Sequence, residues 1–198
     1  MSAQATALVE IYFTNENIGY ACGQSVNGAC ILKTTDGGLT WNEIYNSNNA
    51  GEYVWKIQGF NNNADILFAS IEAVSPNPGK LLKSTDGGET WLSYDAPETD
   101  IQAVGFIDEN RGWMGGHNTG FFETNDGGET WTNLNVGSNL NRIFVVGSNT
   151  AFASGTSIYK FTSESLSLQD IEIHSRSGLE IKILKNPVKT DLELSIEY

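Results

Sequence analysis

The sequence predicts an all-β fold in which one four-stranded antiparallel unit is repeated along the chain. Three observations support this prediction. One eight-residue motif occurs three times, and glycine accounts for 21 of the 198 residues while aromatic residues make up 11%. In addition, little of the chain follows the 3.6-residue periodicity of an amphipathic helix. Short strands joined by tight turns are therefore expected.

The repeated motif, hereafter the octet, follows the pattern hydroxyl-x-Asp-Gly-Gly-x-Thr-Trp. It occupies residues 34–41, 84–91 and 124–131. Asp-Gly is a strong short-range signal for a hairpin, because glycine adopts positive φ without steric cost and Asp accepts hydrogen bonds from N–H groups of its turn. An apolar pair and a charged residue precede each octet, and the final Trp offers a large apolar surface. Each octet is therefore predicted to join two strands.

The octets divide the chain into units that each contain four predicted strands. The first three units each run through three strands into an octet and end with a fourth strand. A fourth unit begins in the same way but stops where an octet and an outer strand are expected. The predicted units cover about residues 8–46, 53–95, 101–136 and 140–162.

The octets resemble Asp-boxes, the S/T-x-D-x-G-x-T-W turns that are also called BNR repeats. Asp-boxes occur in sialidases, xyloglucanases, sortilin-like receptors and the photosystem II stability/assembly factor family, all of them β-propellers. The doubled Gly and the preceding I/L-L-K are most similar to the photosystem II assembly factor type. The resemblance implies a partial or small β-propeller with four recognisable blades. It gives a structural role to Asp36, Gly38, Trp41, Asp86, Gly88, Trp91, Asp126, Gly128 and Trp131.

The end of the chain resembles a secretion signal. Residues 1–7 are expected to form an N-terminal tail and the polar residues 163–180 a linker. Residues 181–198, with an apolar strand, the Asn186-Pro187 turn and an amphipathic strand, resemble the start of the C-terminal sorting domain of the type IX secretion system, here truncated. The resemblance implies a Bacteroidetes-like bacterial protein, secreted or held at the outer-membrane surface, that engages the type IX machinery. An ordinary strand-turn-strand is the alternative.

The charge of the chain bears on its partners. There are 24 acidic and 11 basic residues, which gives a formal net charge of -13. Nucleic-acid binding is disfavoured, because a phosphate backbone requires clustered Lys and Arg. No run of 18 apolar residues occurs, so no membrane span is predicted. A solvated acidic surface is the expected result.

The sequence contains no constellation that indicates catalysis. Equivalent octet aspartates in successive blades are rotated about the propeller axis, whereas glycosidic pairs of carboxylates need separations of roughly 5 to 10 Å. His117 and His174 are too few and too far apart to form a metal site with the two cysteines. Neither a phosphate-binding loop nor a nucleophile elbow is present. We therefore expect no catalytic residue, no metal and no cofactor.

Binding is the remaining function, and the resemblance places ligands on the loops opposite the octets. These loops are rich in Asn, Glu and Asp, which suit hydroxyl-rich ligands, and aromatic residues outside the octets could stack on a sugar or a protein. The alternative is that each aromatic ring fills the core. The loops run over residues 24–27, 46–52, 72–78, 95–100 and 117–119, and the candidate ligand-binding residues are Tyr53, Trp55, Trp113, His117 and Asn118.

We interpret the chain as a secreted or cell-surface, non-catalytic binding or scaffold protein that recognises a glycan, a protein or a cell-wall component. The alternative is a fragment of an Asp-box glycoside hydrolase, similar to a xyloglucanase or a sialidase, whose catalytic residues lie outside this chain.

Two cysteines flank the first predicted turn. In a hairpin centred on Val26, Cys22 and Cys30 are equidistant from the centre and face each other. A cross-strand disulfide is then geometrically feasible. Two reduced, buried thiols are the alternative.

Overall fold

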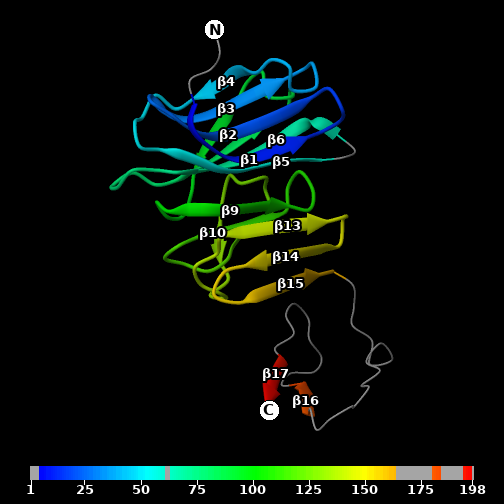
Figure 1. Ribbon diagram of the computed structural model, residues 1–198. Helices are drawn as coiled ribbons and strands as arrows, with labels where there is room; N and C mark the ends of the chain where they lie inside the picture. Colours follow the sequence, from blue (N-terminus) through cyan, green and yellow to red (C-terminus); the bar gives the residue numbers. More distant parts are fainter. Residues whose placement is uncertain (1–4, 61–62, 164–179, 184–193, 198) are drawn as a thin grey trace.

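Every regular element of the described residues is a β-strand. The computed structural model describes residues 5–60, 63–163, 180–183 and 194–197 (Figure 1). Their strands form three four-stranded sheets, one three-stranded sheet and one two-stranded sheet, all antiparallel. In the four larger sheets the strands lie in chain order, so each sheet is a meander. The predicted all-β fold with four-stranded antiparallel units is confirmed.

The first sheet contains β1 (Ala5–Phe13), β2 (Gly19–Ser25), β3 (Gly28–Thr34) and β4 (Asn42–Asn46). The second contains β5 (Tyr53–Phe60), β6 (Asn63–Glu72), β7 (Lys80–Ser84) and β8 (Leu92–Asp95). The third contains β9 (Ile101–Phe106), β10 (Gly112–Gly116), β11 (Phe122–Thr124) and β12 (Thr132–Asn133). The fourth contains β13 (Arg142–Val146), β14 (Thr150–Ser154) and β15 (Ile158–Thr162). Finally, β16 (Glu180–Ile183) pairs with β17 (Leu194–Glu197).

The ends of the chain bear on three further expectations. Strand β1 begins at Ala5, which pairs with Ser25, and therefore includes three residues of the segment expected to be a tail. Residues 164–179 of the expected linker lie outside the described residues. The Asn186-Pro187 turn also lies outside them, so the resemblance to a sorting domain stays a prediction.

The first four sheets follow one another in space in chain order (Figure 1). Strand β5 contacts β1, β9 contacts β5, and β13 contacts β9, so the first strands of neighbouring sheets lie together. One hydrophobic cluster fills each space between neighbouring sheets. Examples are Ile31 with Ile57 between the first and second sheets, Phe68 with Phe106 between the second and third, and Trp113 with Ile143 between the third and fourth.

The octets form the hairpins that the sequence predicts, and the second octet shows the geometry. The Ser84 hydroxyl donates to Asp86 Oδ1 at 2.8 Å and accepts a hydrogen bond from Gly88 N at 2.9 Å. Both the N–H, at 2.9 Å, and the hydroxyl of Thr90 donate to the carboxylate of Asp86. Gly87 and Gly88 have φ of 69° and 86°, which explains the doubled glycine. The first and third octets have the same bonds.

The octet of one sheet also docks on the preceding sheet. The carbonyl of Gly87 accepts hydrogen bonds from Tyr20 Oη at 2.9 Å and from Lys33 Nζ at 2.8 Å, both of the first sheet. The ring of Trp91 meets that of Tyr45 edge to face, with a centroid distance of 6.2 Å. Octets therefore connect neighbouring sheets as well as neighbouring strands.

The octet carboxylates predict loss of stability in acid. Hydrogen bonds, above all from the Thr hydroxyl at the seventh position, lower the pKa of Asp36, Asp86 and Asp126 to about 2. An Asp in an unfolded chain has a pKa of about 4. The stabilisation is therefore complete above about pH 4 and is lost as the pH falls through the folded pKa of about 2. We expect urea midpoints to fall across this window. Replacing all three residues by Asn should flatten the fall, and an unchanged slope would contradict the prediction.

The register of the first hairpin corrects the expected position of the cysteines. Val26 and Asn27 form the turn, so Cys22 pairs with Ile31, and Cys30 pairs with Gly23. Because side chains alternate along a strand, the two cysteines point to opposite faces of the sheet. The expectation that they face each other is therefore wrong. Both are free and buried, and burial raises the pKa of both thiols, that of Cys30 to about 11.

Candidate functional site

The loops after the second and fourth strands lie together at one end of the sheets, hereafter the loop face. In a meander these loops lie opposite the turn between the third and fourth strands, which the octets form. Backbone hydrogen bonds connect them: Ala73 N donates to Thr99 O at 3.1 Å, and Gly79 N to Glu98 O at 2.9 Å. The loops from the second and third sheets are thus held as one surface.

Two of the candidate residues form a stacked pair at this face. Tyr53 and Trp55, both half-buried, have ring centroids 5.2 Å apart and an interplanar angle of 18°. Tyr53 begins β5 and pairs with Glu72 at the end of β6. The register of β5 is irregular between Val54 and Lys56, which is where Trp55 lies. Irregularities of this kind change the direction of a side chain, and here the indole lies beside the preceding ring.

A carboxylate fixes the indole in place. Trp55 Nε1 donates to Glu72 Oε2 at 2.6 Å, and Gln102 Nε2, from the start of β9, donates to the same oxygen at 3.2 Å. Gln102 is buried, so its amide has little freedom to move away. Tyr53, Trp55, Glu72 and Gln102, hereafter the aromatic cluster, join the second and third sheets at the loop face.

Acidic residues flank the aromatic cluster along the chain. Asp100 lies two residues before Gln102 and accepts hydrogen bonds from the side-chain amide of Asn118 and from His117 N, the latter at 3.2 Å. His117 and Asn118 are both exposed. Burial raises the pKa of the nearby Glu98 above its ordinary value. The loop face therefore combines aromatic rings with carboxylates, which suits cations and hydrogen-bond donors.

The structure contradicts one candidate residue. Trp113 is 4% exposed and lies in the cluster between the third and fourth sheets. Its ring centroid is 4.4 Å from that of Phe161, and the guanidinium carbon of Arg111 is 5.5 Å away. Trp113 therefore fills the core, which is the alternative interpretation given above. It cannot stack on a ligand.

A second charged group lies on the first strands. Lys56 Nζ on β5 is 2.6 Å from Glu10 Oε1 on β1, and Arg142 Nε on β13 is 4.0 Å from the other oxygen of Glu10. The Glu10 side chain is only 19% exposed, so its charge is compensated locally. These residues connect the first, second and fourth sheets on the side where their first strands meet.

The described residues contain neither a cluster of metal ligands nor a membrane-spanning helix. In that part of the chain, no group of three or more His, Cys, Asp or Glu residues is arranged to hold a metal ion. Among the same residues, no helix is long and apolar enough to cross a membrane.

Successive four-stranded meanders that pack through their first strands define a β-propeller, and solved structures confirm this class. YCF48 from Cyanidioschyzon merolae aligns with a TM-score of 0.62 and 20% identity over 82% of this chain and 52% of its own. YCF48 bound to D1 peptide aligns at 0.55 and 21% identity, over 82% and 54%. The GH74 enzyme of Niastella koreensis aligns at 0.57 and 21%, over 79% and 28%.

The other comparisons define the limits of this likeness. No protein-family model and no curated protein matches the chain. The chain spans about half the length of the YCF48 structures it matches. At these identities the likeness shows the fold, and function has to be argued from the loop face.

Proposed function

We propose that the chain is a non-catalytic binding protein that holds a segment of another protein, one that carries a basic side chain, on the loop face. The aromatic cluster carries this proposal. Tyr53 and Trp55 are stacked, and Trp55 is tied to Glu72, before any ligand binds. Rings that are already fixed lose little conformational entropy on binding, which favours affinity.

The charge of the face favours a basic partner. Glu72 and Asp100 contribute carboxylates, and the chain as a whole has a net charge of -13. A Lys or Arg side chain of the partner can stack on an aromatic ring and pair with a carboxylate. One solved relative of the same fold is described as bound to D1 peptide, which supports a protein ligand by analogy.

The proposal includes two further assignments, one for the octets and one for secretion of the protein. We assign the three octets as Asp-boxes with a structural role, in keeping with their internal hydrogen bonds. We assign residues 181–198 as the start of a type IX sorting domain, which would place the protein outside the cell or on its surface. A fusion of these residues to a reporter, expressed in a bacterium with that secretion system, tests the second assignment. A reporter that stays inside the cell would contradict it.

Removal of the Glu72 carboxylate, which holds Trp55 in the aromatic cluster, should weaken peptide binding. Glu72→Gln keeps the shape of the side chain but removes the charge that holds Trp55 and attracts a basic ligand. We expect at least about a tenfold weaker affinity, and a larger loss for Trp55→Ala, as is usual for central aromatic residues. Isothermal titration calorimetry with a library of Lys- and Arg-containing peptides measures both effects.

The matched control is Glu129→Gln, which removes an exposed carboxylate at the octet end of the third sheet. Its affinity should equal that of the unmodified protein. Equal losses for Glu72→Gln and Glu129→Gln would indicate a general effect of charge and contradict a site at the loop face. Saturable binding of xyloglucan oligosaccharides, with no binding of peptides, would replace the protein ligand by a glycan.

The likeness to the GH74 enzyme supports one alternative, a glycoside hydrolase whose catalytic residues lie outside this chain. Neither function predicts turnover by this chain alone, so binding separates them: the alternative predicts saturable binding of xyloglucan oligosaccharides, whereas our proposal predicts binding of basic peptides. Incubation of the protein with xyloglucan, followed by measurement of new reducing ends, tests whether the chain itself is catalytic. Turnover that Glu98→Gln and Asp100→Asn abolish would overturn the non-catalytic proposal.

A further inference from the structure

The first and second sheets share one pattern on the face that each turns toward the next sheet, hereafter the forward face. Tyr20 pairs with Lys33 in the first sheet, and Phe68 pairs with Lys83 in the second. The Lys Nζ lies 5.9 Å from the first ring centroid and 5.4 Å from the second. Two residues before each lysine, Ile31 and Leu81 are 0% exposed, because the next sheet covers them.

The fourth sheet repeats the pattern on a face that is open. Phe152 pairs with Lys160, whose Nζ lies 6.0 Å from the ring centroid. Two residues before that lysine, Ile158 is 80% exposed, whereas its counterparts in the first two sheets are fully buried. Phe152 and its cross-strand neighbour Phe144 are 40% and 66% exposed. The forward face of the fourth sheet thus has the side chains of a sheet-to-sheet interface.

The first sheet carries the complementary half of such an interface on its backward face, the one turned away from the second sheet. The pairing of the first two strands of each sheet defines equivalent positions. By this pairing, Ile11 of the first sheet is equivalent to Ile57 of the second, Val104 of the third and Ile143 of the fourth. Those three are 1%, 0% and 3% exposed, whereas Ile11 is 61% exposed. The residue at this position is therefore covered in the second, third and fourth sheets and open in the first.

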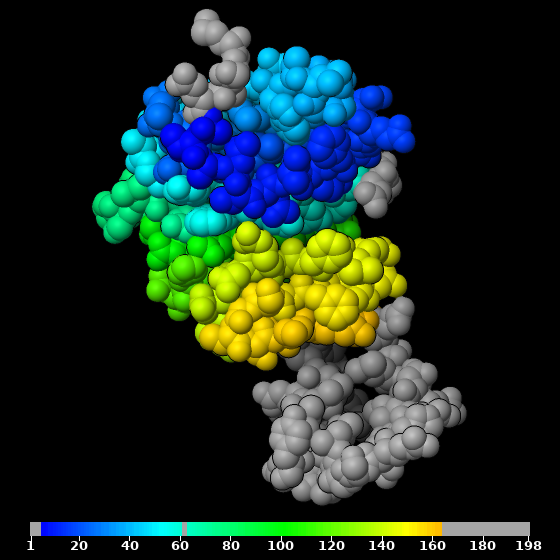
Figure 2. Space-filling view, viewed as in Figure 1, coloured from blue at the N-terminus to red at the C-terminus, as the bar shows by residue number. Residues whose placement is uncertain are grey.

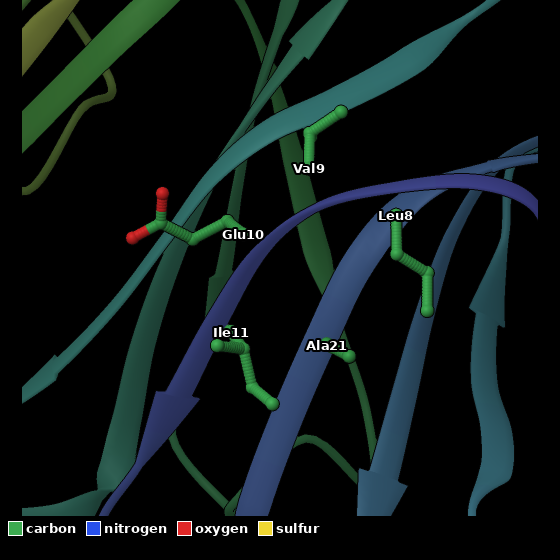
Figure 3. A pocket seen from close by; sticks show the side chains of 5 residues that line it. All are labelled: Leu8, Val9, Glu10, Ile11 and Ala21. Carbon is green, nitrogen blue, oxygen red and sulfur yellow. The ribbon is translucent and has the colours of Figure 1, made fainter.

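The backward face of the first sheet is also hollowed. Leu8 is 49% exposed, whereas Val54, at the equivalent position of the second sheet, is 0% exposed. Figure 3 shows Leu8 and Ile11 of β1 beside Ala21 of β2, at a shallow depression of about 250 Å³. The lining residues are Leu8, Val9, Glu10, Ile11 and Ala21. Apolar side chains of a further sheet could enter this depression.

We propose that a second copy of this chain docks head to tail, with the forward face of its fourth sheet against the backward face of the first sheet. The two faces are the halves of one repeated interface, so they are complementary. In Figure 2, β1 in dark blue and the fourth sheet in yellow lie on the same side of the molecule. Two copies related by a two-fold axis can therefore form the contact twice and close a ring.

The two faces themselves favour a second copy as the occupant, because one copy presents both halves of the repeated interface: Ile158 is exposed on the forward face of the fourth sheet, and Ile11 is exposed on the backward face of the first. Each copy has a net charge of -13, so repulsion opposes association, and salt should strengthen the dimer by screening that repulsion.

Sedimentation equilibrium of the full chain tests the proposal. We expect a concentration-dependent dimer that is stronger at higher salt. Ile11→Asp and Ile158→Asp each place a carboxylate in the proposed interface and should raise the dimer dissociation constant at least about tenfold. Leu92→Asp is the matched control, because Leu92 is 58% exposed but belongs to the second sheet and to neither face. Circular dichroism and thermal melting confirm that each variant is folded.

Mixing the two variants separates a head-to-tail dimer from other arrangements. A heterodimer of the Ile11→Asp and Ile158→Asp chains retains one interface in which both faces are unmodified, so the mixture should recover dimer that neither variant forms alone. A monomer at every concentration would overturn the proposal and leave the faces to further sheets or to another protein. A dimer that Ile11→Asp weakens and Ile158→Asp does not, or a mixture without recovery, would also overturn it.

Discussion

Phe68→Ala is expected to lower the free energy of unfolding by about 3–5 kcal/mol, the usual cost of removing a buried aromatic ring. Phe68 is 0% exposed and lies between the second and third sheets. Its ring is stacked on that of Phe106, with centroids 3.7 Å apart and an interplanar angle of 3°, and it meets Phe60 edge to face. Alanine would leave a cavity between the two sheets that neither backbone can fill.

Phe152→Ala is the control, because Phe152 occupies the equivalent position of the fourth sheet. Phe152 is 40% exposed, and none of the four-stranded sheets of the described residues covers it. At concentrations where the protein is monomeric, we expect a loss below about 1 kcal/mol, as for most exposed substitutions. Urea unfolding followed by circular dichroism measures both variants. Equal losses would mean that the ring is stabilised within its own sheet, and that the covering sheet contributes little.

The octet hairpins are a part of the fold that could be predicted from the sequence. Their chemistry is local: an Asp, two glycines with positive φ and a Thr lie within one turn, so the residues alone define the hairpin. The register of the first hairpin is also local, yet its prediction was wrong. A turn of Val26 and Asn27 shifts the centre by half a residue relative to Val26. That shift is enough to place Cys22 and Cys30 on opposite faces.

The contacts of the candidate site depend on how strands and sheets are arranged in space, and local sequence patterns do not contain that information. Tyr53 and Trp55 could be proposed because they are aromatic residues next to a polar loop outside the octets. Glu72 and Gln102 could not, since their contact with Trp55 crosses from one strand to the next and from one sheet to another. Trp113 has the same chemistry as Trp55 but lies on the forward face of the third sheet, where the fourth sheet covers it.

Gly116→Ala is expected to cost about 3 kcal/mol, the upper end for overpacking of a buried position. A Cβ at Gly116 would lie 1.8 Å from the carbonyl oxygen of Asp100 and 2.2 Å from Glu98 Oε1. The first of these atoms is backbone, so the strand or the loop has to move. Because Asp100 accepts the hydrogen bond from His117 N, the change should also disturb the loop face. Urea unfolding measures the loss of stability, and peptide titration measures the effect on binding.

Gly147→Ala separates this clash from backbone strain. Gly147 has φ of 69°, and no atom lies within 4 Å of a Cβ built on it, so alanine there suffers only the cost of a left-handed conformation, about 1–2 kcal/mol. Gly147 lies between β13 and β14, away from the loop face, so peptide binding should be unchanged. A larger loss for Gly116→Ala, with weaker binding, would show that close packing of β10 against the Asp100 carbonyl shapes the proposed site. Equal losses would mean that the loop relaxes around the new methyl group.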